Sequence, residues 1–329
     1  MKTAILFIIF NRLDTTQKVF EKIHEVQPER LYLASDGPRK NKEGEDELVQ
    51  NVRQWVLDHI DWPCTVKERF NSENLGCGKN VSGAITWFFE NEAEGIILED
   101  DCVPHSDFFG YCEELLSKYR DDKRVWHICG TNPLGISDIL ESYFFSKYMH
   151  CWGWASWADR WRHYTFDLKE YDKSSLKNLS SQKEVWNYFK RVLEKMKRHE
   201  VDTWDYQWFL NVLAYNGLCI MPAKNLISNI GLVGTHMTDD KNPDCNRPVY
   251  PCLPLVHPQL IALNPPLNQQ VIKRCISISD SPIHSNKITK KIIRLGCALI
   301  PITSWRRRIR TAGFARIEKR QRSCRENKC

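Results

Sequence analysis

Three consecutive acidic residues follow a short apolar run, and they are the side chains of this chain best suited to chemistry. Ile96–Leu98 precede Glu99, Asp100 and Asp101. Successive side chains of an extended backbone point to opposite faces, so at least one of the three carboxylates must point away from the others. Because Mg²⁺ and Mn²⁺ prefer carboxylate oxygens and keep positions open for water and phosphates, the triplet predicts a metal clamp on a diphosphate. The alternative is a solvated acidic turn.

Loops that precede the acids supply candidates for binding a nucleotide sugar. Asp36 follows a predicted strand, where a nucleoside contact is expected, although Ser-Asp-Gly-Pro is also a good turn sequence. The glycines of Asn74–Lys79 would let the backbone approach a ligand while Lys79 neutralises phosphate, and a plain loop is the alternative. Arg12, directly after the first strand, is a candidate for contact with the pyrophosphate or the base.

A transfer that inverts configuration needs a general base for the acceptor hydroxyl, and an isolated carboxylate in an aromatic pocket suits that task. Asp205 is the predicted base; the competing explanation is a favourable acid in the first turn of a helix. Asp202 is the better candidate for a helix cap. His236 lies in a glycine-bearing segment and is predicted to reach the metal or the diphosphate, with a structural role as the alternative.

Tryptophan rings can pack against the C–H faces of sugars while the indole N–H donates a hydrogen bond. Most aromatic residues in a domain of this size belong to the core. The sequence therefore predicts a sugar platform at one or two of four candidates and packing roles for the others. The candidates are Trp152, Trp154, Trp204 and Trp208, with Trp154 preferred for the donor.

The elements that would position these residues begin with four βα repeats, which predict an α/β fold with a mostly parallel central sheet flanked by helices. A mixed, Trp-rich half that binds the acceptor follows it. The predicted strands are Ile5–Phe10, Leu31–Ala34, Thr65–Arg69, the run before the acids, and Val125–Cys129. The predicted organisation is a nucleotide-sugar-binding half (1–130), an acceptor-binding and catalytic half of the same domain (131–265) and a basic extension (266–329).

Charge is distributed unevenly along the 329 residues, whose formal net charge is +6. The segment Lys287–Lys328 contains 14 Lys and Arg residues against 2 acidic ones, which leaves 33 basic and 39 acidic residues upstream. A uniformly basic nucleic-acid-binding surface is therefore not expected. The tail alternates basic clusters with apolar residues, which suits contact with an anionic membrane. A solvated basic tail is the alternative.

The thirteen cysteines include no Cys-x-x-Cys pair, so neither a zinc site nor a secreted disulfide framework is predicted. Reduced thiols fit a cytoplasmic setting better. The apolar run Ala4–Phe10 is too short for a signal peptide and is interpreted as the first strand.

Taken in order, these motifs resemble those of the GT-A glycosyltransferases, in particular bacterial relatives of N-acetylglucosaminyltransferase I. The motifs are Leu98–Asp101, Pro104 with Asp107–Phe109, Trp152–Trp154, Trp204–Asp205 and Gly234–His236. The resemblance implies that Asp101 approaches a Mn²⁺ (or Mg²⁺) bridging the donor diphosphate. Glu99 and Asp100 would then face the donor, with Asp100 at the ribose or sugar, while Asp36 lies near the nucleoside and Asp205 is the base.

The implied function is sugar transfer from a nucleotide sugar, with UDP-GlcNAc or another UDP-hexose the best candidate, to a glycan or lipid-linked acceptor. The setting would be bacterial surface polysaccharide or lipopolysaccharide synthesis, at the inner face of the plasma membrane. Two alternatives stay open. One is a sugar nucleotidyltransferase, although Asn11–Asp14 lacks its glycine-rich, arginine-bearing loop. The other is a carbohydrate-binding protein that has lost catalysis.

Overall fold

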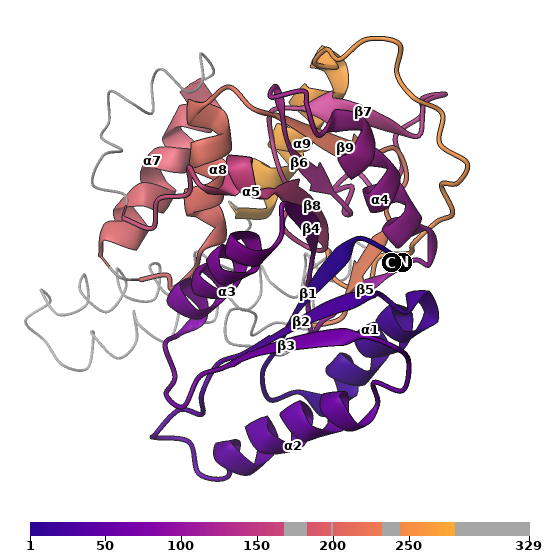
Figure 1. Cartoon of the computed structure of the whole chain (residues 1–329). Coiled ribbons are helices and arrows are strands. Elements are labelled where there is room, and N and C mark those ends of the chain that lie inside the picture. The colour runs from indigo at the N-terminus through magenta and orange to yellow at the C-terminus, as the bar shows by residue number, and fades with distance from the viewer. Residues whose placement is uncertain (168–182, 199, 232–243, 280–329) are drawn as a thin grey trace, which may run out of the picture. The chain divides into compact units, whose positions relative to one another are not determined.

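The computed structural model describes residues 1–167, 183–198, 200–231 and 244–279 (Figure 1). The strands in this part are β1 (Ala4–Ile9), β2 (Arg30–Ser35), β3 (Thr65–Phe70), β4 (Glu94–Glu99), β5 (Cys102–Pro104), β6 (Val125–Cys129), β7 (Tyr143–Ser146), β8 (Trp154–Trp157), β9 (Leu218–Pro222) and β10 (Ile227–Asn229). The helices are α1 (Leu13–Val26), α2 (Glu45–Asp58), α3 (Cys77–Asn91), α4 (Asp107–Tyr119), α5 (Ala158–Trp161), α7 (Lys183–Lys197), α8 (Asp205–Ala214) and α9 (Pro265–Ser279). The chain divides into two compact units, Met1–Arg274 and Cys275–Cys329.

An eight-stranded sheet forms the centre of the first unit, in the order β3-β2-β1-β4-β8-β6-β9-β7. The strands β1 to β4 pair in parallel, as the βα repeats predicted. Beyond β4 the sheet is mixed, because β8 runs antiparallel to both β4 and β6, and β7 runs antiparallel to β9. The α/β fold with a mostly parallel first half and a mixed second half is therefore confirmed. One sheet runs through both predicted halves, which agrees with a single domain.

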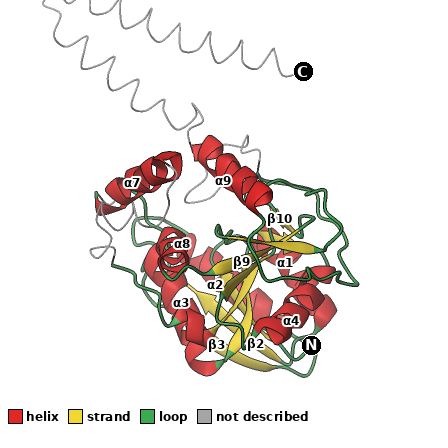
Figure 2. Ribbon diagram, turned by 90° about the horizontal axis from the view of Figure 1, so that it is seen from above, coloured by secondary structure: helices red, strands yellow, loops and turns green. Residues whose placement is uncertain are grey.

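Both faces of β1 are buried, which explains its unbroken apolar sequence. Ile5, Phe7 and Ile9 belong to one core cluster together with apolar residues of α1, α2 and α4 (Figure 2). The alternate residues of β1 face the opposite side of the sheet, where α3 packs. Helices on both faces hold the parallel strands, so the carboxyl ends of those strands form one edge where ligands of such sheets collect.

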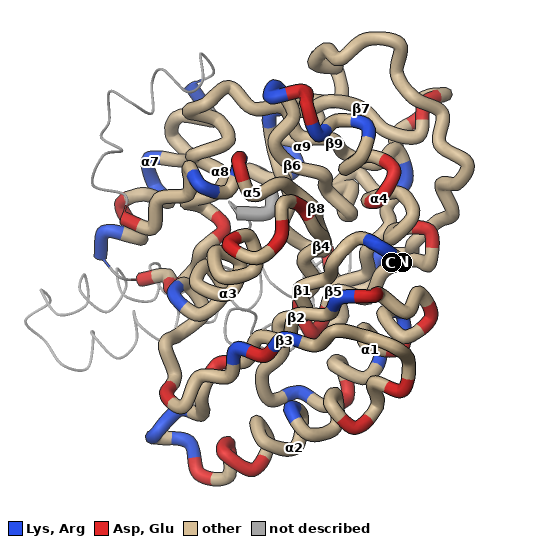
Figure 3. Tube along the Cα trace, in the orientation of Figure 1, with Lys and Arg blue, Asp and Glu red and all other residues tan. Residues whose placement is uncertain are grey.

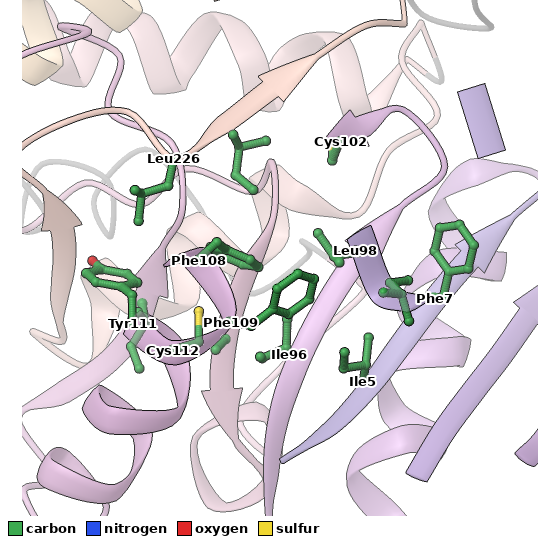
Figure 4. Packing of buried hydrophobic residues seen from close by; sticks show 14 of the residues in the cluster. Ile5, Phe7, Ile96, Leu98, Cys102, Phe108, Phe109, Tyr111, Cys112 and Leu226 are labelled. Carbon is green, nitrogen blue, oxygen red and sulfur yellow. The ribbon is translucent and has the colours of Figure 1, made fainter. Parts of the chain in front are cut away.

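The strand that carries the acids is fixed from the side of α4. Phe108 and Phe109 pack with Ile96 and Leu98 of β4, and all four side chains are buried (Figure 4). Burying an aromatic side chain of this size removes about 1.5–3 kcal/mol of unfavourable contact with water. The acids therefore extend from a strand held by the best-packed part of the core.

The first turn of α1 differs from the sequence prediction of a capping box at Asp14 and Gln17. The helix begins at Leu13, its N-cap residue is Arg12, and no side chain caps it. Thr16 instead donates its hydroxyl to the Arg12 carbonyl at 2.7 Å. The capping-box prediction was wrong because Arg12 turns its side chain toward the acids.

Lysine and arginine residues are interspersed with aspartate and glutamate along the described trace (Figure 3). This mixed distribution agrees with the acidic body predicted upstream of the basic tail, and it differs from the single-sign face of a nucleic-acid-binding surface. Among the helices of the described ranges, none is long and apolar enough to span a bilayer.

Candidate functional site

The parallel pairing of β1 with β4 brings Arg12 to the acidic triplet. Ile8 pairs with Glu99, so the residues that follow each strand lie side by side. The Arg12 guanidinium donates a hydrogen bond to Asp101 Oδ2 at 2.9 Å and forms a second ion pair with Asp100 Oδ1. Asp100 is buried and Asp101 is partly exposed. The structure therefore gathers three predicted donor-site residues into one cluster, joined by an internal cation.

A short antiparallel ribbon, β5 with β10, holds Asp101 from its other side. Asn229 Nδ2 donates to Asp101 Oδ1 at 3.2 Å, and the Ile230 amide donates to the Asp101 carbonyl at 2.8 Å. A Cβ atom at Gly231 would lie 2.2 Å from Asp101 Oδ2, so only glycine fits at this position. The sequence gave no signal for this ribbon, since each of its strands is three residues long.

The charges at this edge shift one another's pKa values. Burial and the carboxylates of Asp101, Asp100 and Asp205 raise the pKa of Glu99 to about 8. Burial also raises the pKa of Asp100, although the Arg12 guanidinium opposes that rise. The pKa of Arg12 is raised, because Asp100 and Asp101 outweigh the effect of its burial. The cluster therefore carries more negative charge than its single guanidinium balances.

The acid pair fits a hard divalent cation in its chemistry. Asp100 Oδ2 is buried and has no hydrogen-bond partner in the described part of the chain, so one carboxylate oxygen is left for a ligand. Mg²⁺ and Mn²⁺ sites commonly use one or two carboxylates and complete their shell with water and phosphate oxygens. Within the described ranges, no group of three His, Cys, Asp or Glu side chains is arranged to hold a metal. His236 lies outside those ranges, and its role stays a prediction.

Asp205, the predicted base, lies at the start of α8 and belongs to the same site. Its Oδ1 atom is hydrogen-bonded by the Thr203 hydroxyl, and the Cys151 thiol donates to its Oδ2 atom at 3.8 Å. Asp205 contributes to the raised pKa of Glu99, so the two carboxyl groups are close enough to interact. Asp205 is partly exposed, which leaves its carboxylate open to an incoming hydroxyl.

Asp36 is a buried loop anchor. Its carboxylate accepts hydrogen bonds from the amides of Gly37 at 3.0 Å, Leu75 at 2.9 Å and Gly76 at 3.0 Å. Asn71 Nδ2 donates to it as well, at 3.2 Å. These contacts match the turn-chemistry alternative and tie the loop after β2 to the loop before α3. A direct contact of Asp36 with a nucleoside stays a prediction.

The predicted phosphate loop is already occupied by a carboxylate of the chain. Asp202 accepts a hydrogen bond from the Gly78 amide at 3.0 Å, at the first turn of α3. Asp202 was predicted as a helix cap, and the helix that it caps is α3 across 124 residues of sequence. Lys79 is exposed beside it. A phosphate at this helix start would have to compete with Asp202.

The tryptophans predicted as sugar platforms are mostly covered. The exposed fractions of Trp154, Trp204 and Trp208 are 1%, 2% and 0%. Trp154 stacks on Trp204 with ring centroids 5.7 Å apart and on His127 with centroids 4.8 Å apart. The preference for Trp154 as a donor contact was therefore wrong, because both faces of its ring pack in the core. Trp152 is partly exposed.

His127 sits inside this aromatic cluster in a neutral form. Trp208 Nε1 donates to His127 Nδ1 at 3.1 Å, and His127 Nε2 contacts the His150 carbonyl at 3.0 Å. The first contact needs an unprotonated Nδ1 and the second a protonated Nε2, which fixes one neutral tautomer. Burial lowers the pKa of His127 to about 3.

A pH dependence of stability follows from His127. Its folded pKa lies below the unfolded value of about 6.5, so its contribution is present above pH 6.5 and is lost as the pH falls toward 3. In a His127→Gln variant we expect the free energy of unfolding to fall less steeply between pH 6.5 and 4, by up to about 1.4 kcal/mol per pH unit. Urea denaturation across this range measures the slope. The exposed His24→Gln is the control, and equal slopes in wild type and His127→Gln would contradict the assignment.

Comparison with known proteins gives distant likenesses. No protein-family model and no curated protein matches the chain. TarS 1–349 of S. aureus is 8% identical, with a TM-score of 0.37 over 69% of this chain and 60% of that one. A UDP-glucose pyrophosphorylase complexed with UDP-glucose is 12% identical, with a TM-score of 0.31 over 50% of this chain and 79% of that one. HddC of Yersinia pseudotuberculosis is 12% identical, with a TM-score of 0.28 over 48% and 77%. Likenesses this distant identify neither the reaction nor the substrate.

Proposed function

We propose that this chain is a metal-dependent glycosyltransferase. It transfers a sugar from a nucleotide sugar, with UDP-GlcNAc or another UDP-hexose the best candidate, to a glycan or lipid-linked acceptor, with inversion. The observation that supports this most is the convergence of Asp100 and Asp101 with Asp205 at the carboxyl edge of the parallel strands. The resemblance of the motif order to relatives of N-acetylglucosaminyltransferase I is the reason for preferring UDP-GlcNAc.

Each residue of the cluster has a place in this reaction. Asp100 and Asp101 hold Mn²⁺ or Mg²⁺, and the bound ion offsets the charge that develops on the departing diphosphate. Asp205 takes the proton of the acceptor hydroxyl, whose oxygen bonds to the anomeric carbon as the bond to the diphosphate breaks. The Thr203 hydroxyl and the Cys151 thiol orient that base. Glu99 lies between the acid pair and the base, facing the donor.

Arg12 changes partners in this proposal. Its guanidinium pairs with both Asp100 and Asp101, so a divalent ion has to displace it. A displaced guanidinium at this edge is suited to a phosphate, because it matches oxyanions in a bidentate manner. The predicted contact of Arg12 with the pyrophosphate would then form only when donor and ion are present together.

A panel of UDP- and GDP-sugars with Mn²⁺ tests the proposed function. Hydrolysis or transfer of at least one nucleotide sugar is the expected result. Exchange of pyrophosphate into a nucleotide sugar would instead identify a sugar nucleotidyltransferase. Binding of sugars without any turnover would identify a carbohydrate-binding protein.

The basic tail supports a proposal about location. Lys287–Arg325 alternates basic clusters with apolar residues such as Ile292, Ile293 and Trp305, and it lies outside the described residues. Each basic residue near an anionic membrane contributes about 1 kcal/mol of attraction, so a cytoplasmic enzyme with a lipid-linked acceptor would gain from such a tail. We expect the full chain to float with anionic liposomes and a chain ending at Asn286 to remain in solution. Equal flotation of the two would rule out the tail as the anchor.

A further inference from the structure

An exposed aromatic ring lies beside the candidate base. Phe166 is 40% exposed, and its ring lies against the first turn of α3. A Cβ atom at Gly78 would be 3.2 Å from Phe166 Cε2, 2.7 Å from Asp202 Oδ1 and 2.9 Å from the Thr203 carbonyl oxygen. The ring and the segment before α8 therefore meet at one glycine, where a larger side chain would not fit.

Contacts of the preceding residues connect Phe166 to Asp205. The Thr203 hydroxyl is hydrogen-bonded to the Asp205 carboxylate. Tyr164, two residues before Phe166, donates its hydroxyl to the Trp204 carbonyl at 3.2 Å. The pKa of Tyr164 is raised by burial and, to a smaller extent, by Asp205. The segments that carry Phe166 and Asp205 therefore run side by side.

The position of Phe166 separates it from the end of the site that would hold phosphate. Asp101 contacts Arg12, Asn229 and the backbone at Ile230. Asp205 interacts with Glu99 on one side and with Thr203 on the other. The groups thus follow one another from the acid pair, through Glu99 and Asp205, to the ring. A base between donor and acceptor has the acceptor on the side away from the diphosphate.

We infer that Phe166 is the platform on which the acceptor sugar lies, with a sugar hydroxyl at Asp205. The inference rests on the proposed function and adds a subsite to it. An aromatic face packs against the C–H groups of a sugar ring, and the adjacent carboxylate accepts hydrogen bonds from hydroxyl groups. The tryptophans that the sequence suggested for this task are buried, whereas Phe166 is open to solvent beside the base.

Tyr215 provides a matched control. It is the other aromatic residue among the large exposed hydrophobic side chains of the described ranges, with an exposed fraction of 53%. Its ring stacks on Trp126, with centroids 5.0 Å apart. Trp126 lies near the start of β6, which runs in the same direction as β4 because both are antiparallel to β8. Tyr215 is therefore at the edge of the sheet opposite the acids.

Saturation-transfer NMR on the full chain, with methyl glycosides of glucose, galactose, mannose and N-acetylglucosamine as probes, tests the inference. We expect at least one glycoside to bind the wild type, and Phe166→Ala to weaken that binding about tenfold. Tyr215→Ala should bind like the wild type, and the affinity of all three proteins for UDP with Mn²⁺ should be the same. If Phe166→Ala does not fold, Phe166→Leu keeps the apolar volume and should show the same loss.

Several results would overturn the platform. These are glycoside binding that Phe166→Ala leaves unchanged, the absence of glycoside binding by the wild type, an equal loss in Tyr215→Ala, or a parallel loss of UDP affinity, which would place the ring on the donor side. Failure of the proposed function has a different signature, because it appears as the absence of nucleotide-sugar turnover with Mn²⁺ whether or not glycosides bind.

Discussion

Replacing Asp101 by asparagine is expected to lower the rate of sugar transfer by at least about a hundredfold, because the ion that offsets charge on the departing diphosphate loses a charged ligand. The substitution preserves the size of the side chain. Its contacts with Arg12 and Asn229 can persist through the amide oxygen, so the fold should be retained. The measurement is kcat at saturating UDP-sugar and Mn²⁺, together with the thermal unfolding midpoint.

An exposed acid elsewhere supplies the control for Asp101. Asp121 follows α4 on the surface of the protein, and Asp121→Asn removes the same charge without touching the acid cluster. Its turnover should equal that of the wild type. Near wild-type turnover of Asp101→Asn in the presence of Mn²⁺ would contradict the assignment of Asp101 to the metal.

The second large effect is expected at Asp205. An Asp205→Asn variant cannot accept the proton of the acceptor hydroxyl, and loss of a general base typically costs about 10²–10⁴-fold in rate. The amide oxygen of asparagine can still accept the hydrogen bonds of the Thr203 hydroxyl and the Cys151 thiol. We therefore expect kcat to collapse while UDP binding in the presence of Mn²⁺ stays unchanged. That combination separates a base from a metal ligand.

Asp202 is the matched neighbour for this test. It carries the same charge three residues earlier, and its carboxylate accepts the Gly78 amide at the start of α3. Asp202→Asn should therefore affect stability more than the chemical step. If Asp202→Asn abolishes transfer while Asp205→Asn turns over like the wild type, the two roles have been assigned in the wrong order.

The first half of the fold could be predicted because its strands are buried on both faces. Unbroken apolar runs such as Ala4–Ile9 and Ile96–Leu98 suit strands of a parallel sheet, and the helices between them follow the helical period. The meeting of Arg12 with Asp100 and Asp101 also follows from that order, since both groups come after the ends of adjacent parallel strands.

The remaining site contacts depend on partners far apart in sequence, which residue types and local spacing do not specify. Asp36 has the same local sequence whether it faces a nucleoside or the amides of Leu75 and Gly76, and the structure has the second arrangement. Trp154 is equally compatible with a sugar platform and with the core. Packing against His127 and Trp204 decides between these roles, and neither contact is local.

The binding of UDP, measured by titration calorimetry with and without Mn²⁺, tests the central claim most directly, because it asks whether the acids at the end of β4 join an ion to a diphosphate. We predict that Mn²⁺ strengthens UDP binding to the wild type and that this gain disappears in Asp101→Asn. UDP binding that is independent of Mn²⁺ in the wild type, or an undiminished gain in Asp101→Asn, would contradict the account.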